Sequence, residues 1–419
     1  MVHRHLESAI LAALADSPVV LLVGARQSGK STLIQSPGIQ KNNPRFLTLD
    51  DANVLAAAMT DPAGFLSSYP EPLVLDEIQR APELFLALKA SVDRDRRPGR
   101  YLLSGSANVL LLPKVADSLA GRMEVLTLWP FSQGELEGVK EGFVDALFAA
   151  APPPHLKPIQ GWDERKEAQR RALLGGFPEV VARPTEERRK AWFGSYLTTL
   201  LQRDVRDLSR IEDMTAVPRL LSILAARTGG LLNTTDLSRS SGMAQTTLKR
   251  YLSLLETVFL VQTLPAWSGN LGKRFVKMPK MFLSDSGLAA DLLNLTLERV
   301  IREPGGFGPV LENFVAQELR KQAAWSRQRP QLFHWRTHAQ HEVDLVMEAG
   351  GRVVGIEVKA SSTITPDDFK GLKALAVETG GQFVRGALLY TGQEMLSFGE
   401  NLLALPISAL WRLGVGEGR

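Results

Sequence analysis

The apolar and polar positions divide the chain into an α/β beginning, a helical middle and an α/β end. Residues 19–23 form a continuous apolar run rich in valine, which predicts a strand buried on both faces of a parallel sheet. Apolar runs at 72–75 and 100–103 predict two further strands. The apolar residues of 6–14 follow helical spacing, which predicts an amphipathic helix rather than a cleavable secretory signal.

A proline-rich segment separates this region from the helices that follow. Residues 149–158 cannot form a helix or a central strand, because proline lacks the backbone N–H that both need. Helical spacing resumes at 165–174 and at 192–208. We therefore expect a linker followed by two helices.

The next segment has the element order of a winged helix-turn-helix. Helical patterns at 217–224 and 244–256 flank a short capped helix near Thr234. The apolar stretches 258–261 and 275–282 then predict the two strands of a wing.

The third helix of this unit presents polar side chains on its outer face. Gln245, Thr246, Lys249 and Arg250 are expected there, and they suit contacts with DNA phosphates. Units of this kind also serve as packing or protein-interaction modules, so both uses stay open.

The end of the chain predicts a β-hairpin that carries acidic residues. Residues 341–346 alternate like a strand, and 353–359 form the returning strand, after an amphipathic helix at 311–319. Asp344 and Glu357 should meet near this hairpin.

These acids resemble a nuclease-like site. Lys359 points to the same face as Glu357, because side chains two residues apart share a face of a strand. With Glu312 as the acid on the helix, the residues match the Asp-x(n)-Glu-x-Lys pattern of the restriction-endonuclease-like fold. Carboxylates and a lysine can bind a second Mg²⁺ or Mn²⁺ and activate water. Glu342 is expected to be a flanking surface acid, and both cleavage and binding of branched or broken DNA stay open.

The most specific motif follows the first predicted strand. The residues read Gly24-Ala25-Arg26-Gln27-Ser28-Gly29-Lys30-Ser31-Thr32, a complete G-x-x-x-x-G-K-S phosphate loop between a strand and a helix. The backbone N–H groups of such a loop and the helix N-terminus cradle an anion. Lys30 is expected to reach the β- and γ-phosphates, and Ser31 to hold Mg²⁺.

A partner motif ends the second strand, where Asp76 and Glu77 follow an apolar run. In phosphate-loop ATPases the first acid holds the magnesium shell. The second is placed to orient the attacking water as a general base. We therefore assign Asp76 to the metal and Glu77 to catalysis, and the order of the acids favours hydrolysis of ATP.

Polar residues near the third strand are candidate sensors of the γ-phosphate. Ser104, Ser106 and Asn108 occupy the strand tip, and the sequence does not indicate which of the three is the sensor. Arg122 is a candidate arginine finger or sensor, because a guanidinium stabilises transition-state charge. An exposed, solvated arginine is the alternative.

With these motifs the chain resembles a prokaryotic AAA+-type ATPase family whose members usually carry a C-terminal domain of formerly unknown function. The segments 73–79, 104–108, 119–122, 174–180 and 202–205 carry the resemblance beside the phosphate loop. It implies an α/β ATPase core followed by a helical lid, a nuclease-like C-terminal domain, and a homo-oligomer such as a hexameric ring.

The length of 419 residues predicts two or three domains. The expected fold is α/β: a P-loop AAA+-type ATPase core, a helical lid, a winged helix-turn-helix and a C-terminal restriction-endonuclease-like domain. The expected boundaries are 1–148 for the core, 149–212 for linker and lid, 213–285 for the winged helix and 286–419 for the C-terminal domain.

Composition narrows the chemistry. The chain has no cysteine, which excludes a disulfide scaffold and a thiolate zinc site, and its histidines lack the spacing of a closed zinc site. The net charge of +4 permits a nucleic-acid partner without demanding one. No apolar run approaches the ~20 residues of a membrane helix, so we expect a cytoplasmic protein.

The leading hypothesis is an ATP- and Mg²⁺-dependent motor or switch that remodels or processes DNA, including branched or junction DNA. One alternative is an ATP-gated, metal-dependent DNA nuclease. Another is a nucleotide-controlled regulatory protein that binds a protein partner.

Overall fold

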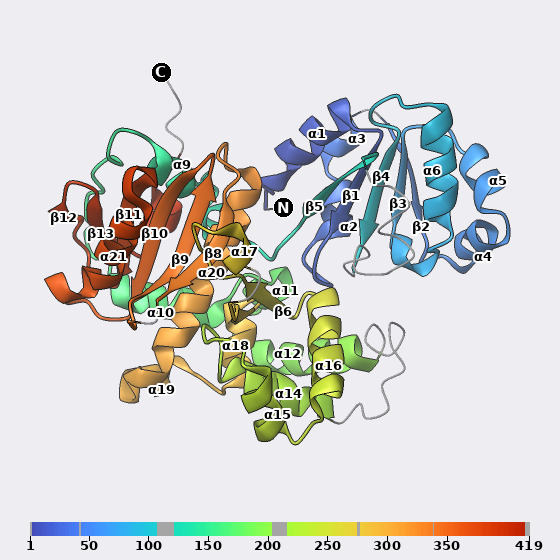
Figure 1. The fold of residues 1–419 in the computed structure, drawn as a ribbon. Coiled ribbons are helices and arrows are strands. Elements are labelled where there is room, and N and C mark those ends of the chain that lie inside the picture. The colour runs from blue at the N-terminus through green and yellow to red at the C-terminus, as the bar shows by residue number, and fades with distance from the viewer. Residues whose placement is uncertain are drawn as a thin grey trace.

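The computed structural model describes residues 2–41, 43–106, 121–202, 216–274, 277–337 and 339–414. Figure 1 shows two sheet-containing lobes side by side, the N-terminal one in blue and the C-terminal one in orange and red, with most of the middle helices below them. In the part of the chain that the structure describes, no helix is long and apolar enough to cross a membrane.

The N-terminal sheet is parallel and has the strand order β2-β3-β4-β1-β5. Its strands are β1 (Val19–Val23), β2 (Arg45–Thr48), β3 (Leu73–Asp76), β4 (Tyr101–Gly105) and β5 (Met123–Thr127). All residues of β1, β3 and β4 are buried, as their unbroken apolar runs predict. The three strands expected from the sequence are present, whereas β2 and β5 have weaker patterns and were not expected.

Helices cover both faces of this sheet. Val20 and Leu22 of β1 pack with α1 and α2, and Leu21 packs on the opposite face with α6. These helices and their neighbours are α1 (Leu6–Asp16), α2 (Lys30–Ile34), α3 (Pro37–Gln40), α4 (Ala52–Thr60), α5 (Pro62–Ser67), η1 (Ile78–Arg80) and α6 (Leu84–Arg94).

The segment after β5 crosses to the other lobe. It contains α8 (Gln133–Glu137) and α9 (Phe143–Phe148). The N–H of Gly142 donates to Leu413 O at 2.6 Å, and Arg385 donates to Ala146 O at 3.0 Å. The expected ATPase domain included residues 1–148. The apolar face of α9 packs instead into the hydrophobic core of the C-terminal lobe.

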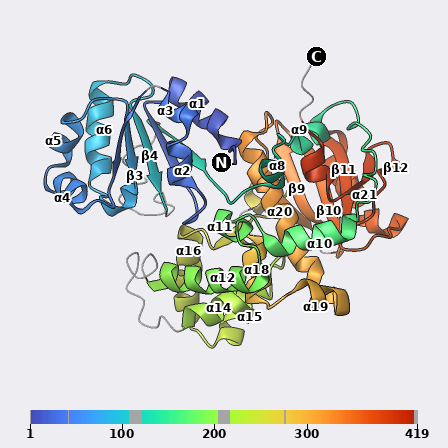
Figure 2. The same ribbon diagram turned by 180° about the vertical axis from the view of Figure 1, so that it is seen from behind.

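The middle of the chain is helical, with no strand from 149 to 202. It contains α10 (Glu164–Leu174), α11 (Pro178–Val181) and α12 (Glu186–Leu200). Figure 2 shows α10 running below the C-terminal sheet. The second half of the helix expected at 192–208 lies partly outside the described residues.

Three helices and two antiparallel strands follow, in the order expected of a winged helix-turn-helix. They are α14 (Ala216–Ala225), α15 (Thr234–Ser241), α16 (Gln245–Thr257), β6 (Val261–Leu264) and β7 (Lys280–Leu283), with α17 (Leu271–Arg274) between the strands. The strand expected at 258–261 begins at Val261, since Phe259 has φ 57° and turns the chain. The strand expected at 275–282 begins at Lys280.

The C-terminal sheet is mixed, with the order β12-β13-β11-β10-β9-β8. Its elements, after α18 (Ser286–Leu292), α19 (Leu297–Arg302) and η4 (Pro304–Gly306), are α20 (Phe307–Trp325), β8 (Gln331–Arg336), β9 (Glu342–Ala349), β10 (Arg352–Lys359), η5 (Pro366–Phe369), α21 (Lys370–Thr379), η6 (Gly380–Gln382), β11 (Phe383–Tyr390), β12 (Leu396–Gly399), β13 (Leu402–Pro406) and α22 (Ala409–Arg412). The helices α20 and α21 cover opposite faces of the sheet. The antiparallel β9–β10 hairpin agrees with the sequence pattern.

The helix α20 also holds the two lobes together. The carboxylate of Glu318, which is fully buried, accepts a hydrogen bond from the N–H of Gln133 at 2.9 Å. Lys321 donates to Phe131 O at 2.8 Å and to Glu318 at 2.7 Å. One helix of the C-terminal lobe thus contacts the segment that leaves the N-terminal sheet.

Candidate active site

The phosphate loop lies between β1 and α2, at the carboxyl edge of the parallel sheet. Gly24, Gln27 and Gly29 all have positive φ, at 154°, 60° and 97°. A Cβ at Gly24 would stand 2.2 Å from Leu128 O, so the close approach of the two backbones requires glycine here. The loop therefore curls tightly over the sheet edge, as its sequence predicts.

Lys30 is the buried cation of this loop. Its Nζ donates to Gly24 O and Ala25 O, each at 2.9 Å, and its side chain lies among the residues that line a pocket of about 370 Å³. The pocket is bounded by most of residues 26–32, by Glu77 and Ser106, and by Pro178 and Glu179 of α11. The ammonium is thus held within the phosphate loop, and its contact with the β- and γ-phosphates stays a prediction.

Asp76 contacts Ser31, which lines this pocket. The Oγ of Ser31 donates to Asp76 Oδ2 at 2.9 Å, although the two residues are 45 positions apart. A serine hydroxyl and a carboxylate at the end of a neighbouring strand are oxygen ligands of the kind Mg²⁺ prefers. The residues present therefore fit the nucleotide and the magnesium ion that the motif implies.

The structure places Ser104 behind Asp76. Ser104 is fully buried in β4, and its Oγ donates to Asp76 Oδ1. It does not line the pocket, so the interpretation of Ser104 as a nucleotide contact is corrected: its hydroxyl orients the carboxylate. Asn108, another of the three candidate sensors, lies outside the described residues.

Glu77 is held by two polar neighbours. Its Oε1 accepts from Ser106 Oγ at 3.1 Å, and its Oε2 accepts from Gln79 Nε2. The Oε1 of Gln79 in turn accepts from the N–H of Ser106 at 3.3 Å. Gln79, which the sequence reasoning did not single out, therefore connects the tips of β3 and β4 and fixes the carboxylate of Glu77.

Arg122 lies far from the loop of its own chain. It precedes β5 where Met123 pairs with Val19, the first residue of β1, whereas the loop follows Val23 at the other end of that strand. Its Nε donates to Asp93 Oδ1 at 2.6 Å. The geometry corrects the hypothesis that Arg122 senses the γ-phosphate within one chain, and a role at a neighbouring subunit stays a prediction.

Arg4 is a residue that sequence reasoning missed. Its guanidinium donates to Ser28 O at 2.7 Å, to Trp129 O at 2.6 Å and to Glu135 Oε1 at 3.1 Å. Burial lowers the pKa of Arg4, and the Glu135 carboxylate opposes this shift. The side chain therefore ties the phosphate loop to the segment after β5.

The predicted nuclease-like residues do come together. The Nζ of Lys359 lies 3.0 Å from Glu357 Oε1, and Asp344 Oδ2 accepts from the N–H of Val358 at 3.0 Å. Burial, with the neighbouring charge of Asp344, raises the pKa of Glu312 and of Glu357 to about 8. The structure thus gathers these acids in a partly dry environment.

A lysine from β7 stands among these acids. The Nζ of Lys280 lies 2.8 Å from Glu342, 2.9 Å from Glu312 and 3.2 Å from Asp344. Glu342, expected to be a flanking surface acid, is 33% exposed and is also an ion-pair partner of Lys280. Among the described residues, no group of three or more His, Asp or Glu side chains is arranged to hold a metal ion.

The two described histidines of this region do not form a zinc site. His334 is buried, and its Nε2 lies 3.0 Å from Met278 O. Burial lowers the pKa of His334 to about 4, so its ring is neutral. His341 lies in the turn before β9, and His338 is outside the described residues.

The candidate DNA-contacting residues line the outer face of α16. Gln245, Thr246, Lys249 and Arg250 are all exposed, while Leu248 faces the core. The Nε2 of Gln245 donates to Thr235 Oγ1 at 3.2 Å. The arrangement leaves the two cations available to a partner.

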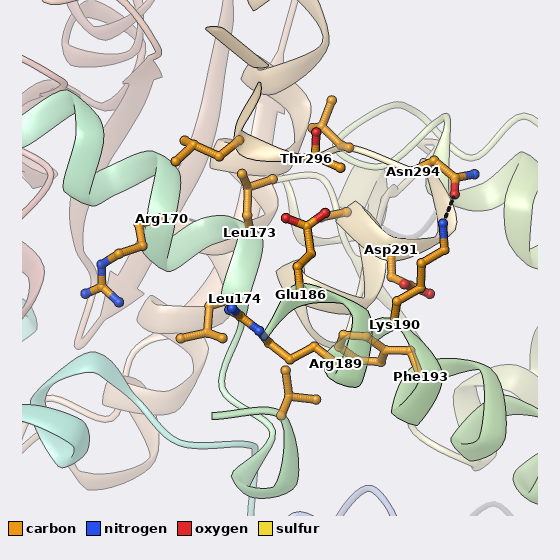
Figure 3. Close-up of a pocket in the computed structure, with 15 residues that line it drawn as sticks. Arg170, Leu173, Leu174, Glu186, Arg189, Lys190, Phe193, Asp291, Asn294 and Thr296 are labelled. Atoms are coloured by element: carbon orange, nitrogen blue, oxygen red, sulfur yellow. Dashed lines mark hydrogen bonds between the residues drawn. The ribbon is translucent and has the colours of Figure 1, made fainter. Parts of the chain in front are cut away.

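A further cavity of about 190 Å³ lies between α10, α12, α18 and the start of α19 (Figure 3). Burial raises the pKa of Asp291 there to about 6, opposed by the charge of Lys190, whose Nζ donates to Asn294 Oδ1 at 2.8 Å. None of the predicted site residues lines this cavity.

Family models match three segments of the chain. An AAA domain model matches residues 16–137, and two domains of unknown function, DUF8612 and DUF4143, match residues 165–299 and 307–410. With the phosphate loop and its acidic partners, the first match defines the protein as an AAA-type ATPase. The class implies ATP and a magnesium ion as its cofactors.

The chain belongs to the same family as two mycobacterial proteins. It is 33% identical over 403 residues to the uncharacterized protein Rv2008c of Mycobacterium tuberculosis, which is 96% of this chain and 83% of that protein. The uncharacterized protein Mb2031c of Mycobacterium bovis matches to the same extent. Among solved structures, the Walker-type ATPase PABY2304 of Pyrococcus abyssi is 17% identical with a TM-score of 0.38, covering 70% of this chain and 96% of that one. A superposition this loose adds nothing about function.

Proposed function

We propose that the protein hydrolyses ATP at the phosphate loop with Lys30, Ser31, Asp76 and Glu77 in the roles their contacts suggest. The observation that supports this best is the convergence of these side chains from α2 and the end of β3. Lys30, Ser31 and Glu77 line one pocket, and Asp76 accepts a hydrogen bond from Ser31. Lys30 has the charge and position to bind phosphate oxygens in place of the two carbonyls it now contacts. Bound nucleotide supplies the phosphoanhydride bond, and magnesium supplies positive charge beside it.

The chain's own groups account for the proton transfer. Glu77 accepts hydrogen bonds at both carboxylate oxygens, yet each oxygen of an ionised carboxylate has a further lone pair. Its carboxylate can therefore orient a water molecule and accept its proton as general base. Asp76, bonded to Ser31 and Ser104, keeps its charge directed at the magnesium position.

Steady-state phosphate release with Mg²⁺ and ATP tests this proposal. Removing the ammonium of Lys30 in Lys30→Ala takes away a charge worth about 4 kcal/mol against a phosphate at ~4 Å, which corresponds to roughly a thousandfold loss in kcat/KM. Glu77→Gln should retain nucleotide binding and lose turnover. Lys41→Ala, at an exposed lysine beyond α3, is the matched control. Turnover that survives both substitutions contradicts the assignment.

A second proposal concerns the partner, and the exposed cations of α16 favour DNA. Nucleotide-dependent movement of the N-terminal lobe would then reach the three-helix unit and act on bound DNA, in a homo-oligomer that places Arg122 of one subunit beside the next. Lys249→Glu with Arg250→Glu should weaken binding to single-stranded, duplex or branched DNA roughly tenfold and reduce the salt dependence of log K by about 2.

ATP turnover with and without each DNA separates this proposal from its alternative. Stimulation by one form of DNA, lost in the double variant, supports a DNA-acting ATPase. If no DNA binds or stimulates turnover, the alternative of a regulatory protein with a protein partner is favoured, and the ATPase assignment is untouched.

A further inference from the structure

A lysine from the β6–β7 hairpin fills the acidic cluster of the C-terminal lobe. We use "acidic cluster" for Glu312 of α20, Glu342 and Asp344 of β9, and Glu357 of β10. The Nζ of Lys280 lies within 3.2 Å of an oxygen of each of the first three. Because an ammonium has three N–H donors, each donor can meet a different carboxylate.

The position of Lys280 is well defined by burial and by its backbone. Its side chain is 2% exposed, and the flanking residues of β7 are bonded to the turn after α14. The N–H of Gly229 donates to Met281 O at 2.8 Å, and that of Leu232 donates to Pro279 O at 2.8 Å. The ammonium is therefore delivered by an ordered strand.

Neutral hydrogen bonds join the same strand to α20. Asn313 Oδ1 accepts from the N–H of Leu283 at 2.9 Å, and Gln317 Nε2 donates to Leu283 O at 2.9 Å. These contacts do not involve the acidic cluster. They should keep β7 docked when the ammonium alone is removed.

A divalent cation held by the three acids that Lys280 contacts does not fit this arrangement. A divalent cation shared by Glu312, Glu342 and Asp344 would need oxygens at about 2.0–2.6 Å from one point, which is the space that Nζ fills. The fourth acid, Glu357, pairs with Lys359 instead, and its Oε2 accepts no hydrogen bond from any residue that the structure describes.

We propose that Lys280 takes the place of a metal ion in the acidic cluster. It is an internal cation that latches β7 to the C-terminal lobe and closes the cluster to divalent cations. The cluster therefore takes up Mg²⁺ or Mn²⁺ only when Lys280 is withdrawn, and the docked form is not a metal-dependent nuclease. The proposal is independent of ATP hydrolysis, so either can fail without the other.

Manganese uptake by the full-length, nucleotide-free protein tests the latch. Uptake is measured as the loss of the free Mn²⁺ signal in electron paramagnetic resonance spectra. Each variant is compared with its Asp344→Asn counterpart, which subtracts ions bound elsewhere. The wild type should show no uptake that depends on Asp344. Lys280→Met should gain one Mn²⁺ that depends on Asp344, with at least a tenfold rise in affinity over the wild type.

Two further variants provide controls. Lys277→Met removes an exposed lysine from the same segment and should behave as the wild type. Lys280→Arg retains a cation and should also exclude Mn²⁺. If Lys280→Met folds only when Mn²⁺ is supplied, the ion replaces the ammonium and the proposal is supported.

Two results would overturn the proposal. One is uptake of Mn²⁺ by the wild type that disappears in Asp344→Asn, since the cluster would then bind metal with Lys280 in place. The other is a Lys280→Met protein that shows no Asp344-dependent uptake of Mn²⁺, whether it folds without the ion or is refolded with Mn²⁺ present.

Discussion

Gln79 should set the turnover number through Glu77 without contributing to nucleotide binding. Its Nε2 donates to Glu77 Oε2, and its Oε1 accepts from the Ser106 N–H at 3.3 Å. A hydrogen bond to a charged group contributes about 1.5–3 kcal/mol. If Gln79→Ala loses that much orientation of the general base, kcat falls roughly 10–100-fold.

The assay is phosphate release at saturating and limiting ATP. KM for ATP should change little, because Gln79 does not line the pocket formed by the phosphate loop. Ser106→Ala is a matched comparison, since it removes the other bond to Glu77 and should lower kcat by a smaller factor. Gln35→Ala, at an exposed glutamine after α2, should leave kcat and KM unchanged.

The decisive test is whether the effect of Gln79→Ala depends on Glu77. In a Glu77→Gln background, Gln79→Ala should cause little further loss, because the group it positions is already gone. A full additional loss there would show that Gln79 acts on something else. A rise in kcat in Gln79→Ala would refute the reasoning by showing that the two bonds restrain Glu77 rather than aim it.

Three other expectations follow from the described contacts. Burial raises the pKa of Glu312 to about 8, well above an unfolded value near 4.3. The contribution of this group to stability is therefore complete below about pH 4 and is lost as the pH rises to about 8. The thermal midpoint should fall over this pH range, and it should fall less in Glu312→Gln. Arg4→Ala removes the bonds to Ser28 O and Trp129 O and leaves the buried Glu135 without its ion-pair partner. Nucleotide affinity should therefore drop roughly 3–10-fold, and the thermal midpoint should fall by a few degrees. Arg45→Ala, at an exposed arginine of β2, should match the wild type in an equilibrium nucleotide titration. Gly24→Ala places a Cβ 2.2 Å from Leu128 O and should lower kcat/KM for ATP by at least roughly tenfold. Gly194→Ala, on α12 with open space around it, should be neutral. Equal activity of the two variants would contradict the close approach.

The sequence predicts the geometry of the phosphate loop because the residues that form it are neighbours along the chain. The phosphate loop, the strand before it and the helix after it occupy neighbouring residues. The apolar run of β3 ends on Asp76, and Glu77 follows directly. The hairpin that bears Asp344 and Glu357 is equally local, since β9 and β10 are joined by a short turn.

Long-range partners were beyond prediction. Arg4 meets Glu135 at a separation of 131 residues, and Lys280 meets Asp344 at a separation of 64. No periodicity distinguishes these residues from solvated cations, because their role depends on the packing of whole elements. For the same reason, the apolar face of α9 predicts a helix but does not indicate which of the two sheets it will cover.

The buried bonds of α20 have a consequence for how this protein can be divided. The family models place a boundary before residue 307, yet Glu318 and Lys321 of that helix are satisfied by Gln133 and Phe131 of the first model's range. A fragment cut at the boundary would expose a carboxylate and an ammonium on one piece and unpaired backbone groups on the other. The C-terminal segment should therefore not be transferable to another protein as an independent module, and expression of the two pieces together should restore what neither retains by itself.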